Sequence, residues 1–254
     1  GKGKSIFKDV KGVSLHQVYG PHPAGNVGVQ IGKISPINAG ERVWTVTPQD
    51  VAIIGELFLT GKFNATRTVA LVGSEVKDAQ YYNVISGAAI ADLVAGKIEG
   101  DNVRVISGDV LTGTKVKMDG NLGFLSNTVT VIPEGNVYRM FGWMPFASPS
   151  VHSASRTGLS WLMPGKKYAP NTNLNGEERA LVVTGEMEAV MPLDIFPMQL
   201  LKACLASDID KMESLGIYEV APEDFALIDY TNTSKLEAQQ IIREALDLMI
   251  KEVG

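Results

Sequence analysis

The sequence is poor in the residues that build metal centres, disulfides and membrane spans. It has one cysteine, Cys204, whereas a disulfide, a cysteine-ligated zinc site or an iron–sulfur cluster needs several thiols. The uncharged run from Met140 to Ser155 contains two prolines and several serines and is too short for a membrane helix. Basic residues number 23 against 28 acidic ones, so the net charge of −5 argues against nucleic-acid binding. A reducing compartment is expected.

The remaining composition is that of a folded protein. Of 254 residues, 45% are hydrophobic and 20% are charged, which excludes a disordered or collagen-like chain. This length suits one large or two smaller domains, and the 26 glycines predict many turns and substantial β structure. The sequence begins at Gly1 and has no apolar signal-sequence core, so we expect a piece of a longer chain.

Local patterns in the first half predict loops, one helix and a small sheet. Glycine and proline punctuate residues Val13 to Ile37, which predicts loop and strand. Thr47 and Pro48 are typical of a helix start, an apolar stripe follows, and Gly61 marks the end. Beyond it, strands are predicted at 66–72, 81–85, 103–106 and 110–111, with a short helix at 88–95. This order of elements is that of a β-grasp module.

The second half is predicted to be irregular at first and then helical. Strands at Thr128–Ile132 and Val137–Trp143 flank a Pro-Glu-Gly-Asn turn and predict a hairpin. A long polar loop covers residues 148–179, with Ala180–Thr184 as the nearby strand candidate. Helices are predicted at 198–205, 210–215, 222–224 and 234–253, the last capped by Ser234. The chain thus divides into a β-rich part (1–195) and a helical part (196–254).

The loop Gly20-Pro21-His22-Pro23-Ala24-Gly25 is the first candidate for a site. Its two prolines fix φ and its glycines permit turns, so it should be rigid and could hold His22 against a ligand or a partner subunit. A purely structural crossover between sheets is the alternative.

Aromatic residues near the long loop are a second candidate. Trp143, Phe146 and Trp161 lie close together in the sequence with several methionines, and such side chains are favoured at contact surfaces. A docking patch and an ordinary core position account for them equally well.

Catalytic and metal-binding constellations are not supported. His16 and His22 lack a known ligand spacing, and no catalytic or metal-binding residue is assigned. A triad of His152 with Ser153 or Ser155 and an aspartate could be assembled only by geometry that the sequence does not show. Cys204 lies on the apolar face of a predicted helix, which favours a buried, inert thiol.

Nine stretches, in order, resemble the A-type subunit of the Na⁺-translocating NADH:quinone oxidoreductase. The resemblance covers nearly the whole chain from about Val13 to Gly254. The stretches are Gly20–Gly25, Gln49–Ala52, Leu57–Gly61, Val103–Gly108, Val110–Thr114, Phe141–Trp143, Thr172–Gly176, Val190–Asp194, and Cys204 with Asp208.

The resemblance implies an α+β fold of several parts. The family is similar to the flavin- and NADH-binding subunit of respiratory complex I. Residues 1–65 would then be the remainder of a Rossmann-like domain, 66–114 a β-grasp (soluble-ligand-binding) domain, 115–195 a β-rich segment with a long loop, and 196–254 a C-terminal helical domain. The complex I relative holds a cluster with cysteines in its helical domain, whereas this chain has only Cys204.

The implied function is that of a peripheral subunit on the cytoplasmic face of the bacterial inner membrane. The complex transfers electrons from NADH to quinone and exports Na⁺. This chain would hold no cofactor and would act in assembly or quinone-side support. NADH, flavins and an iron–sulfur centre would belong to the other subunits of the complex. Those subunits, especially a membrane subunit, would be the partners of this chain, and quinone is a candidate ligand. The fragment alone would not be catalytic.

Two other functions are compatible with the sequence. One is a stand-alone β-grasp module that binds a small ligand, which a thermal-shift screen would detect. The other is an autonomous NADH or flavin enzyme, which a colourless protein without NADH oxidation would exclude.

Overall fold

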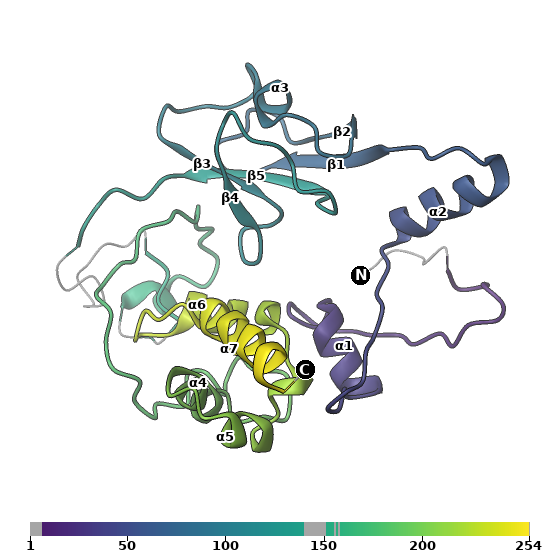
Figure 1. Cartoon of the computed structure of the whole chain (residues 1–254). Helices are drawn as coiled ribbons and strands as arrows, with labels where there is room; N and C mark the ends of the chain where they lie inside the picture. Colours follow the sequence, from purple (N-terminus) through teal and green to yellow (C-terminus); the bar gives the residue numbers. More distant parts are fainter. Residues whose placement is uncertain (1–6, 140–150, 155, 157, 254) are drawn as a thin grey trace. The chain divides into compact units, whose positions relative to one another are not determined.

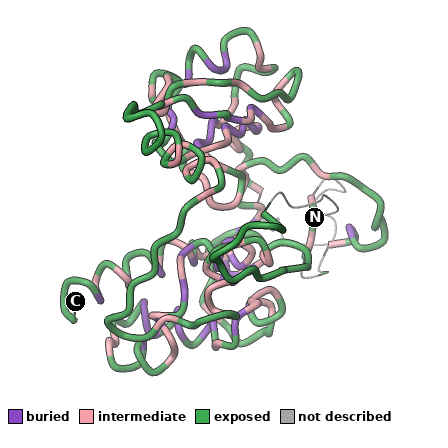
Figure 2. Tube along the Cα trace, turned by 90° about the vertical axis from the view of Figure 1, so that its right-hand side faces the viewer, coloured by how far each residue is buried: buried purple, intermediate pink, exposed green. Residues whose placement is uncertain are grey.

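The computed structural model describes residues 7–139, 151–154, 156 and 158–253, which fall into two compact units. One comprises residues 44–182 and 230–236 and contains the β-sheet. The other comprises residues 1–43, 183–229 and 237–254 and contains most of the helices. Each unit has its own buried residues (Figure 2). Within the described ranges, no helix is both long and apolar enough to cross a bilayer.

The sheet has five strands in the order β2-β1-β5-β3-β4 (Figure 1). Central strand β5 runs parallel to β1 and antiparallel to β3, whereas the β1–β2 and β3–β4 pairs are antiparallel. A short helix, α3, packs against the sheet. This mixed arrangement fits a β-grasp. The element bounds are β1 Thr66–Val72, β2 Gln80–Ile85, α3 Ile90–Val94, β3 Val103–Ser107, β4 Thr114–Val116 and β5 Thr128–Pro133.

Alternating side chains build the core between the sheet and α3. In β1, Val69 and Leu71 are fully buried while Thr68 is exposed, as expected for a strand with one covered face. Gly73 ends this strand with φ of 126°, and a Cβ there would come within 1.9 Å of the Val131 carbonyl oxygen. The other members of the core are Ile90, Leu93, Val94, Val105, Leu122, Val129 and Val131.

The predicted elements at 66–72, 81–85, 88–95 and 103–106 are confirmed, but the predicted strand at 110–111 is wrong. There the Asp109 carboxylate accepts hydrogen bonds from the Leu111 and Thr112 amides, which makes a turn, and β4 starts at Thr114. The sheet also extends beyond residue 114, because β5 lies between β1 and β3.

Helix α2 (Pro48–Thr60) begins and ends where the sequence predicts. Thr47 and Asp50 form a reciprocal capping box, and Gly61 closes the helix with φ of 69°. Asp50 also pairs with the buried Arg67 of β1, and Gln49 accepts a 2.8 Å hydrogen bond from the Thr68 amide. These contacts join the first turn of α2 to the sheet.

The apolar stripe of α2 does not pack as expected. No residue of this helix is buried; Val51 is 50% exposed and Phe58 is 85% exposed. The helix is therefore anchored through its polar first turn rather than through its apolar side chains.

Residues 27–34 form a helix, α1 (Val27–Ile34), so the prediction of loop and strand for this region is wrong there. Gly28 and Gly32 indicated a break, but in the structure they permit close packing. A Cβ at Gly28 would lie 2.5 Å from the Asp224 carboxylate, and one at Gly32 would lie 2.7 Å from Leu193. Glycine here serves helix contact rather than chain reversal.

Two predicted strands after β5 are absent from the described residues. Val137–Arg139 is irregular because the Gly135 amide donates to Thr172 Oγ1 and the Val137 amide donates to Asn173 Oδ1, so these groups form no ladder. The predicted hairpin is therefore wrong in this part, and residues 140–143 lie outside the described ranges. Ala180–Thr184 is also irregular. One 3₁₀ turn, η1 (Leu159–Leu162), lies between these segments in the sequence.

The C-terminal helices pack on one another. Helix α4 contacts α5 and α7, and α7 also contacts the 3₁₀ turn η3. Phe225, Leu200, Leu201, Met212 and Ile242 are among the fully buried side chains. The bounds are α4 Pro197–Leu205, α5 Ile209–Ser214, η2 Ile217–Glu219, η3 Pro222–Phe225, α6 Ala226–Thr231 and α7 Ala238–Glu252, and the boundary between the units falls within α6.

Ser234 does not cap the last helix, contrary to the prediction. Helix α7 begins at Ala238, and the Asp229 carboxylate accepts hydrogen bonds from the amides of Ala238 and Gln239. Ser234 Oγ instead donates to the Ala180 carbonyl oxygen at 3.1 Å. A carboxylate from the preceding helix thus replaces the expected local cap.

Candidate functional site

The proline loop at 20–25 is an ordered turn that leads into α1. The Ala24 amide donates to the Pro21 carbonyl at 3.0 Å, and the Asn26 amide donates to the Pro23 carbonyl at 2.8 Å. The Asn26 side chain donates to the Glu223 carbonyl at 3.1 Å, which fixes the end of the loop against η3. His22 is exposed and Pro23 is half-buried. The loop therefore presents His22 on a defined turn.

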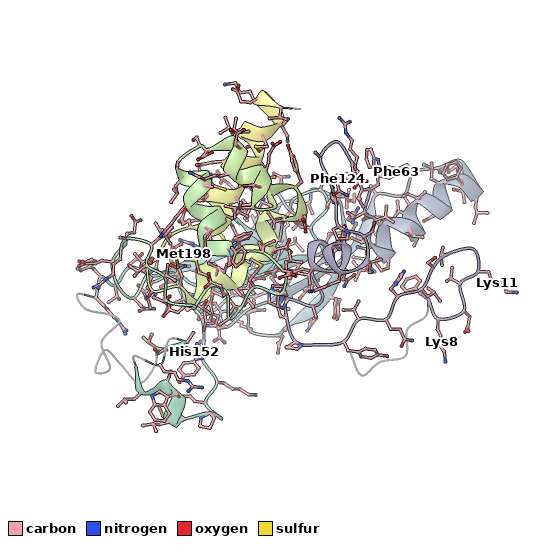
Figure 3. The ribbon with its side chains drawn as sticks, turned by 90° about the horizontal axis from the view of Figure 1, so that it is seen from below. Lys8, Lys11, Phe63, Phe124, His152 and Met198 are labelled. Carbon is pink, nitrogen blue, oxygen red and sulfur yellow. The ribbon has the colours of Figure 1, made fainter. Side chains whose placement is uncertain are left out.

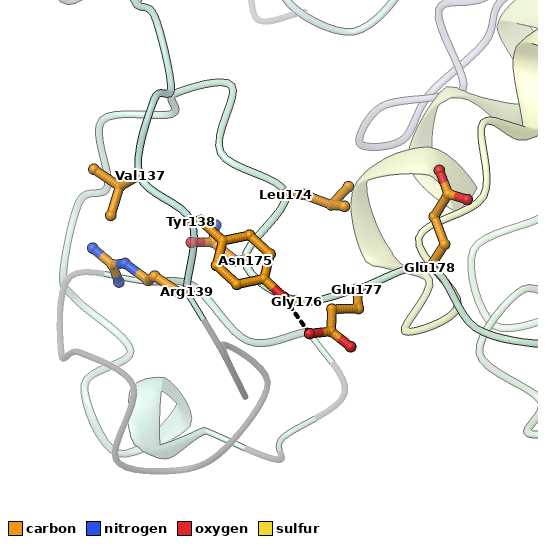
Figure 4. Close-up of a pocket in the computed structure, with 8 residues that line it drawn as sticks. All are labelled: Val137, Tyr138, Arg139, Leu174, Asn175, Gly176, Glu177 and Glu178. Atoms are coloured by element: carbon orange, nitrogen blue, oxygen red, sulfur yellow. Dashed lines mark hydrogen bonds between the residues drawn. The ribbon is translucent and has the colours of Figure 1, made fainter.

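A first cavity, of about 320 Å³, lies where residues 137–139 pass residues 174–178 (Figure 4). The Tyr138 hydroxyl donates to Glu177, and this hydrogen bond raises the pKa of Tyr138. The lining residues are Val137, Tyr138, Arg139, Leu174, Asn175, Gly176, Glu177 and Glu178. The lining contains two glutamates and one arginine, so its charged side chains are mixed, with one more acidic group than basic groups.

Glu134 joins this irregular region to the sheet. It forms a two-point ion pair with Arg104 of β3, accepts from Lys115 of β4 at 3.0 Å, and accepts from Thr172 Oγ1 at 2.9 Å. The Arg104 guanidinium, with Lys115 and Thr172, lowers the pKa of Glu134 to about 2. Gly135 follows, and a Cβ there would lie 2.2 Å from the Asn173 amide nitrogen. The segment at 172–173 is thus held tightly against residues 134–137.

The second cavity is larger, about 610 Å³, and has aromatic walls. Figure 3 labels His152, which lies beside η1. The His152 ring stacks on Tyr230, with 5.8 Å between centroids and 15° between planes, and meets the edge of Tyr168 at 5.3 Å. The other lining residues are Ser153, Ala154, Arg156, Ser160, Trp161, Met163, Pro164 and Lys166.

Polar contacts hold this second cavity in shape. The Ser153 amide donates to Ser160 Oγ at 2.9 Å, and the Gly158 amide donates to Ser153 Oγ at 3.0 Å. The Tyr230 hydroxyl lies 3.0 Å from His152 Nδ1, and burial raises the pKa of Tyr230. This contact fixes the position of the imidazole ring, and the tautomer of His152 sets which of the two groups donates.

The residues that the sequence predicted as site candidates do not come together in one site. Trp161 lines the second cavity and is 53% exposed, whereas Trp143 and Phe146 lie outside the described residues. The loop from Gly20 to Gly25 belongs to the other unit. Among the described residues, His152 contacts tyrosines rather than an aspartate and Ser153 Oγ accepts from the Gly158 amide, so these contacts are not those of a triad. Ser155, the alternative nucleophile, lies outside the described residues.

The remaining candidates behave as inert groups. Cys204 is buried in α4, and burial raises the pKa of its thiol to about 11, as the sequence predicted for an unreactive cysteine. In the described part of the chain, no group of three or more histidine, cysteine or acidic side chains gathers as a metal site.

Sequence reasoning missed most of the second cavity. Arg156, Lys166 and Tyr168 come from the long polar loop, and Tyr230 comes from a helix more than sixty residues later in the chain. No local pattern signals that these side chains meet. The one clue was the length of the loop, because long loops inside compact domains are often functional.

Two domain families match the sequence. Residues 1–63 match the NqrA second alpha/beta domain, and residues 68–118 match the NQRA C-terminal domain of SLBB type. The second match covers β1 to β4 of the sheet.

Curated relatives match nearly the whole chain. The A-type subunit of the Na⁺-translocating NADH-quinone reductase is 38% identical over 241 residues in Neisseria meningitidis serogroup B, and 39% identical over 241 residues in Serratia proteamaculans. The Yersinia pestis protein of the same name is 39% identical over 242 residues. Each alignment covers 94% of this chain and 54% of the relative, so the chain spans about half the length of these proteins. Residues 1–63 and 68–118 thus match domains of the NqrA family, and the chain is similar over nearly its whole length to the A-type subunits of the Na⁺-translocating NADH-quinone reductase.

Proposed function

We propose that this chain acts as an A-type subunit of a membrane complex that transfers electrons from NADH to quinone and couples this transfer to Na⁺ export. The observation that carries the proposal is the 38–39% identity to subunits of that name over 94% of the chain. Both matched domain families support the same assignment. The complex, not this chain alone, would be the enzyme.

The redox groups of the complex would reside in other subunits. An iron–sulfur cluster needs several thiolates, and this chain supplies only Cys204, which is buried. We therefore infer that NADH, flavins and the iron–sulfur centre are held by partners. The chain would act in assembly or on the quinone side, as a peripheral subunit on the cytoplasmic face, docked to a membrane subunit.

The domain division implied by the family completes the proposal. Residues 1–65 would be the remainder of a Rossmann-like domain, 66–114 the β-grasp domain, 115–195 the segment with the long loop, and 196–254 the helical domain. Trp143, Phe146 and Trp161 would form part of the docking patch.

Co-purification tests membership in the complex. The gene for this chain would be tagged in its source organism, the membranes solubilised in mild detergent, and the co-purifying proteins identified by mass spectrometry. We expect the flavin-bearing and membrane subunits of the reductase to be recovered. Recovery of the tagged chain alone would refute a stable association and leave a free ligand-binding module as the better assignment.

The loop at His22 offers a local test. We expect His22→Ala to weaken quinone reduction or subunit retention in the purified complex while the unfolding free energy of the chain changes by less than about 0.5 kcal/mol, because the side chain is exposed. His16→Ala, at a second exposed histidine, is the matched control. Unchanged quinone reduction, inhibitor binding and assembly would show that this loop makes no such contact.

A further inference from the structure

The cavity around His152 combines aromatic walls with positive charge. We propose that it binds a planar aromatic anion, recognised by ring contacts and by the side chains of Arg156 and Lys166. This inference concerns the chain itself and does not depend on its membership in a reductase complex.

Four aromatic rings form part of the wall of this cavity. Trp161 and Tyr168 line the cavity together with the stacked pair of His152 and Tyr230. Trp161 is 53% exposed, so its ring is accessible for contact. Aromatic side chains attract other rings in offset or edge-to-face geometry. A volume of about 610 Å³ is within the range of cavities that hold small organic ligands.

The charge of the lining selects for an anion. Arg156 and Lys166 are both lining residues, and no carboxylate is found among the described residues of this wall. Lys166 Nζ lies 5.3 Å from the centroid of Tyr168, so its charge is held at the aromatic wall. The protein as a whole is acidic, with a net charge of −5, which makes this local cationic surface a distinct feature. A carboxylate or phosphate on the ligand would form charge-assisted hydrogen bonds here.

An unpartnered hydroxyl supports a ligand at this position. The Tyr168 hydroxyl oxygen is buried and has no hydrogen-bond partner in the described part of the chain. Buried polar groups are normally paired, and an unpaired one lowers stability. Tyr168 lines the cavity, so an acceptor atom of a ligand that reached this hydroxyl would pair it.

Matched ligands test the proposal directly. 2-Naphthoate is a planar aromatic anion, and 2-naphthamide has nearly the same shape without the charge. Binding to the full chain would be followed by saturation-transfer NMR and isothermal titration calorimetry. We expect 2-naphthoate to bind saturably with a dissociation constant below about 1 mM, and 2-naphthamide to bind at least about tenfold more weakly. Equal binding of the two, or no saturation by 2-naphthoate up to about 10 mM, would overturn the proposal.

Matched variants locate the binding site. Lys166→Gln should weaken 2-naphthoate binding by about tenfold, whereas Lys167→Gln, at the neighbouring exposed lysine that does not line the cavity, should leave it unchanged. Tyr168→Phe should weaken binding without lowering the thermal midpoint, because it removes an unpaired hydroxyl. Tyr138→Phe, in the other cavity, is its control. Equal effects of Lys166→Gln and Lys167→Gln would place binding elsewhere and refute the assignment.

Discussion

The sheet at residues 66–133 and the described residues of 134–182 (134–139, 151–154, 156 and 158–182), here called the irregular segment, belong to one unit but are stabilised in different ways. In the sheet, strand ladders and a continuous apolar core hold the backbone. In the irregular segment, side-chain oxygens of Thr172, Asn173, Ser153 and Ser160 accept hydrogen bonds from four backbone amides, beside a few turn-type backbone bonds. Both cavities are lined almost wholly by the irregular segment.

This difference suggests that the sheet provides most of the stability of the unit and that the irregular segment provides the surfaces that contact a ligand. A sheet with a packed core tolerates little change, whereas loops carried on such a scaffold can present varied side chains to a ligand. Glu134 is the joint between the two regions, because it follows β5 directly and binds Arg104 and Lys115 of the sheet and Thr172 of the irregular segment. Substitutions in the core of the sheet should therefore lower the unfolding free energy of the unit most. Substitutions in the irregular segment should mainly alter the binding of a ligand.

The largest effect is expected from the core of the sheet. Leu71→Ala should lower the unfolding free energy by about 3 kcal/mol, because the side chain is fully buried and the change leaves a cavity. Leu174→Ala, at a 51% exposed leucine of the irregular segment, should cost less than about 1 kcal/mol. Urea denaturation measures both values. Similar losses for the two variants would remove the contrast between the regions.

A smaller effect is expected at the joint. Glu134→Gln should lower the unfolding free energy by about 2 kcal/mol at pH 7, since it removes a partly buried carboxylate paired with two cations. Glu99→Gln, at an exposed glutamate, is the control. A loss no larger than that of the control would show that the ion pairs contribute nothing.

The same carboxyl gives the joint a pH dependence. The folded pKa of Glu134 is lowered from 4.5 to about 2, so its contribution is complete above the unfolded pKa and is lost as the pH falls from about 5 to about 2. Denaturation curves measured across this range should converge for the native chain and Glu134→Gln. A difference that persisted unchanged at pH 2 would contradict this account.

The smallest effect is expected within the irregular segment. Thr172→Ala should cost about 1 kcal/mol, because the Gly135 amide loses its acceptor and Glu134 loses a donor. Thr172→Ser keeps the hydroxyl and should restore most of this loss. Thermal denaturation followed by circular dichroism distinguishes them. If the serine variant were as unstable as the alanine variant, the methyl group rather than the hydrogen bonds would be responsible.

The sheet was largely predictable because its signals are local. β-Branched runs mark β1 and β3, and the cap at Thr47 and Asp50 marks α2, each within a few residues. The position of β5 was not predictable from its own residues, because parallel pairing with β1 joins segments far apart in the sequence. The hairpin predicted for β5 is wrong for the same reason, because the distant residues Thr172 and Asn173 accept hydrogen bonds from the Gly135 and Val137 amides that follow the strand.

The candidate site was less predictable than the fold. Gly28 and Gly32 were interpreted as breaks, although they allow α1 to approach Asp224 and Leu193. Trp161 is a sequence candidate because aromatic residues and methionines lie close together near the long loop, whereas Tyr168 and Tyr230, which share its cavity, carry no periodic signal. Residues that meet through tertiary structure need coordinates, whereas residues that form a cap or a strand can be identified from the chain.

A measurement of Na⁺-dependent electron transfer tests whether this chain acts in the NADH-quinone reductase. The rate of quinone reduction by NADH would be measured in membranes of the source organism with and without Na⁺, before and after deletion of the gene that encodes this chain. If this chain acts in the reductase, the Na⁺-stimulated part of the rate disappears on deletion and returns when the gene is restored. A Na⁺-stimulated rate unchanged by deletion would contradict the assignment of this chain to the reductase.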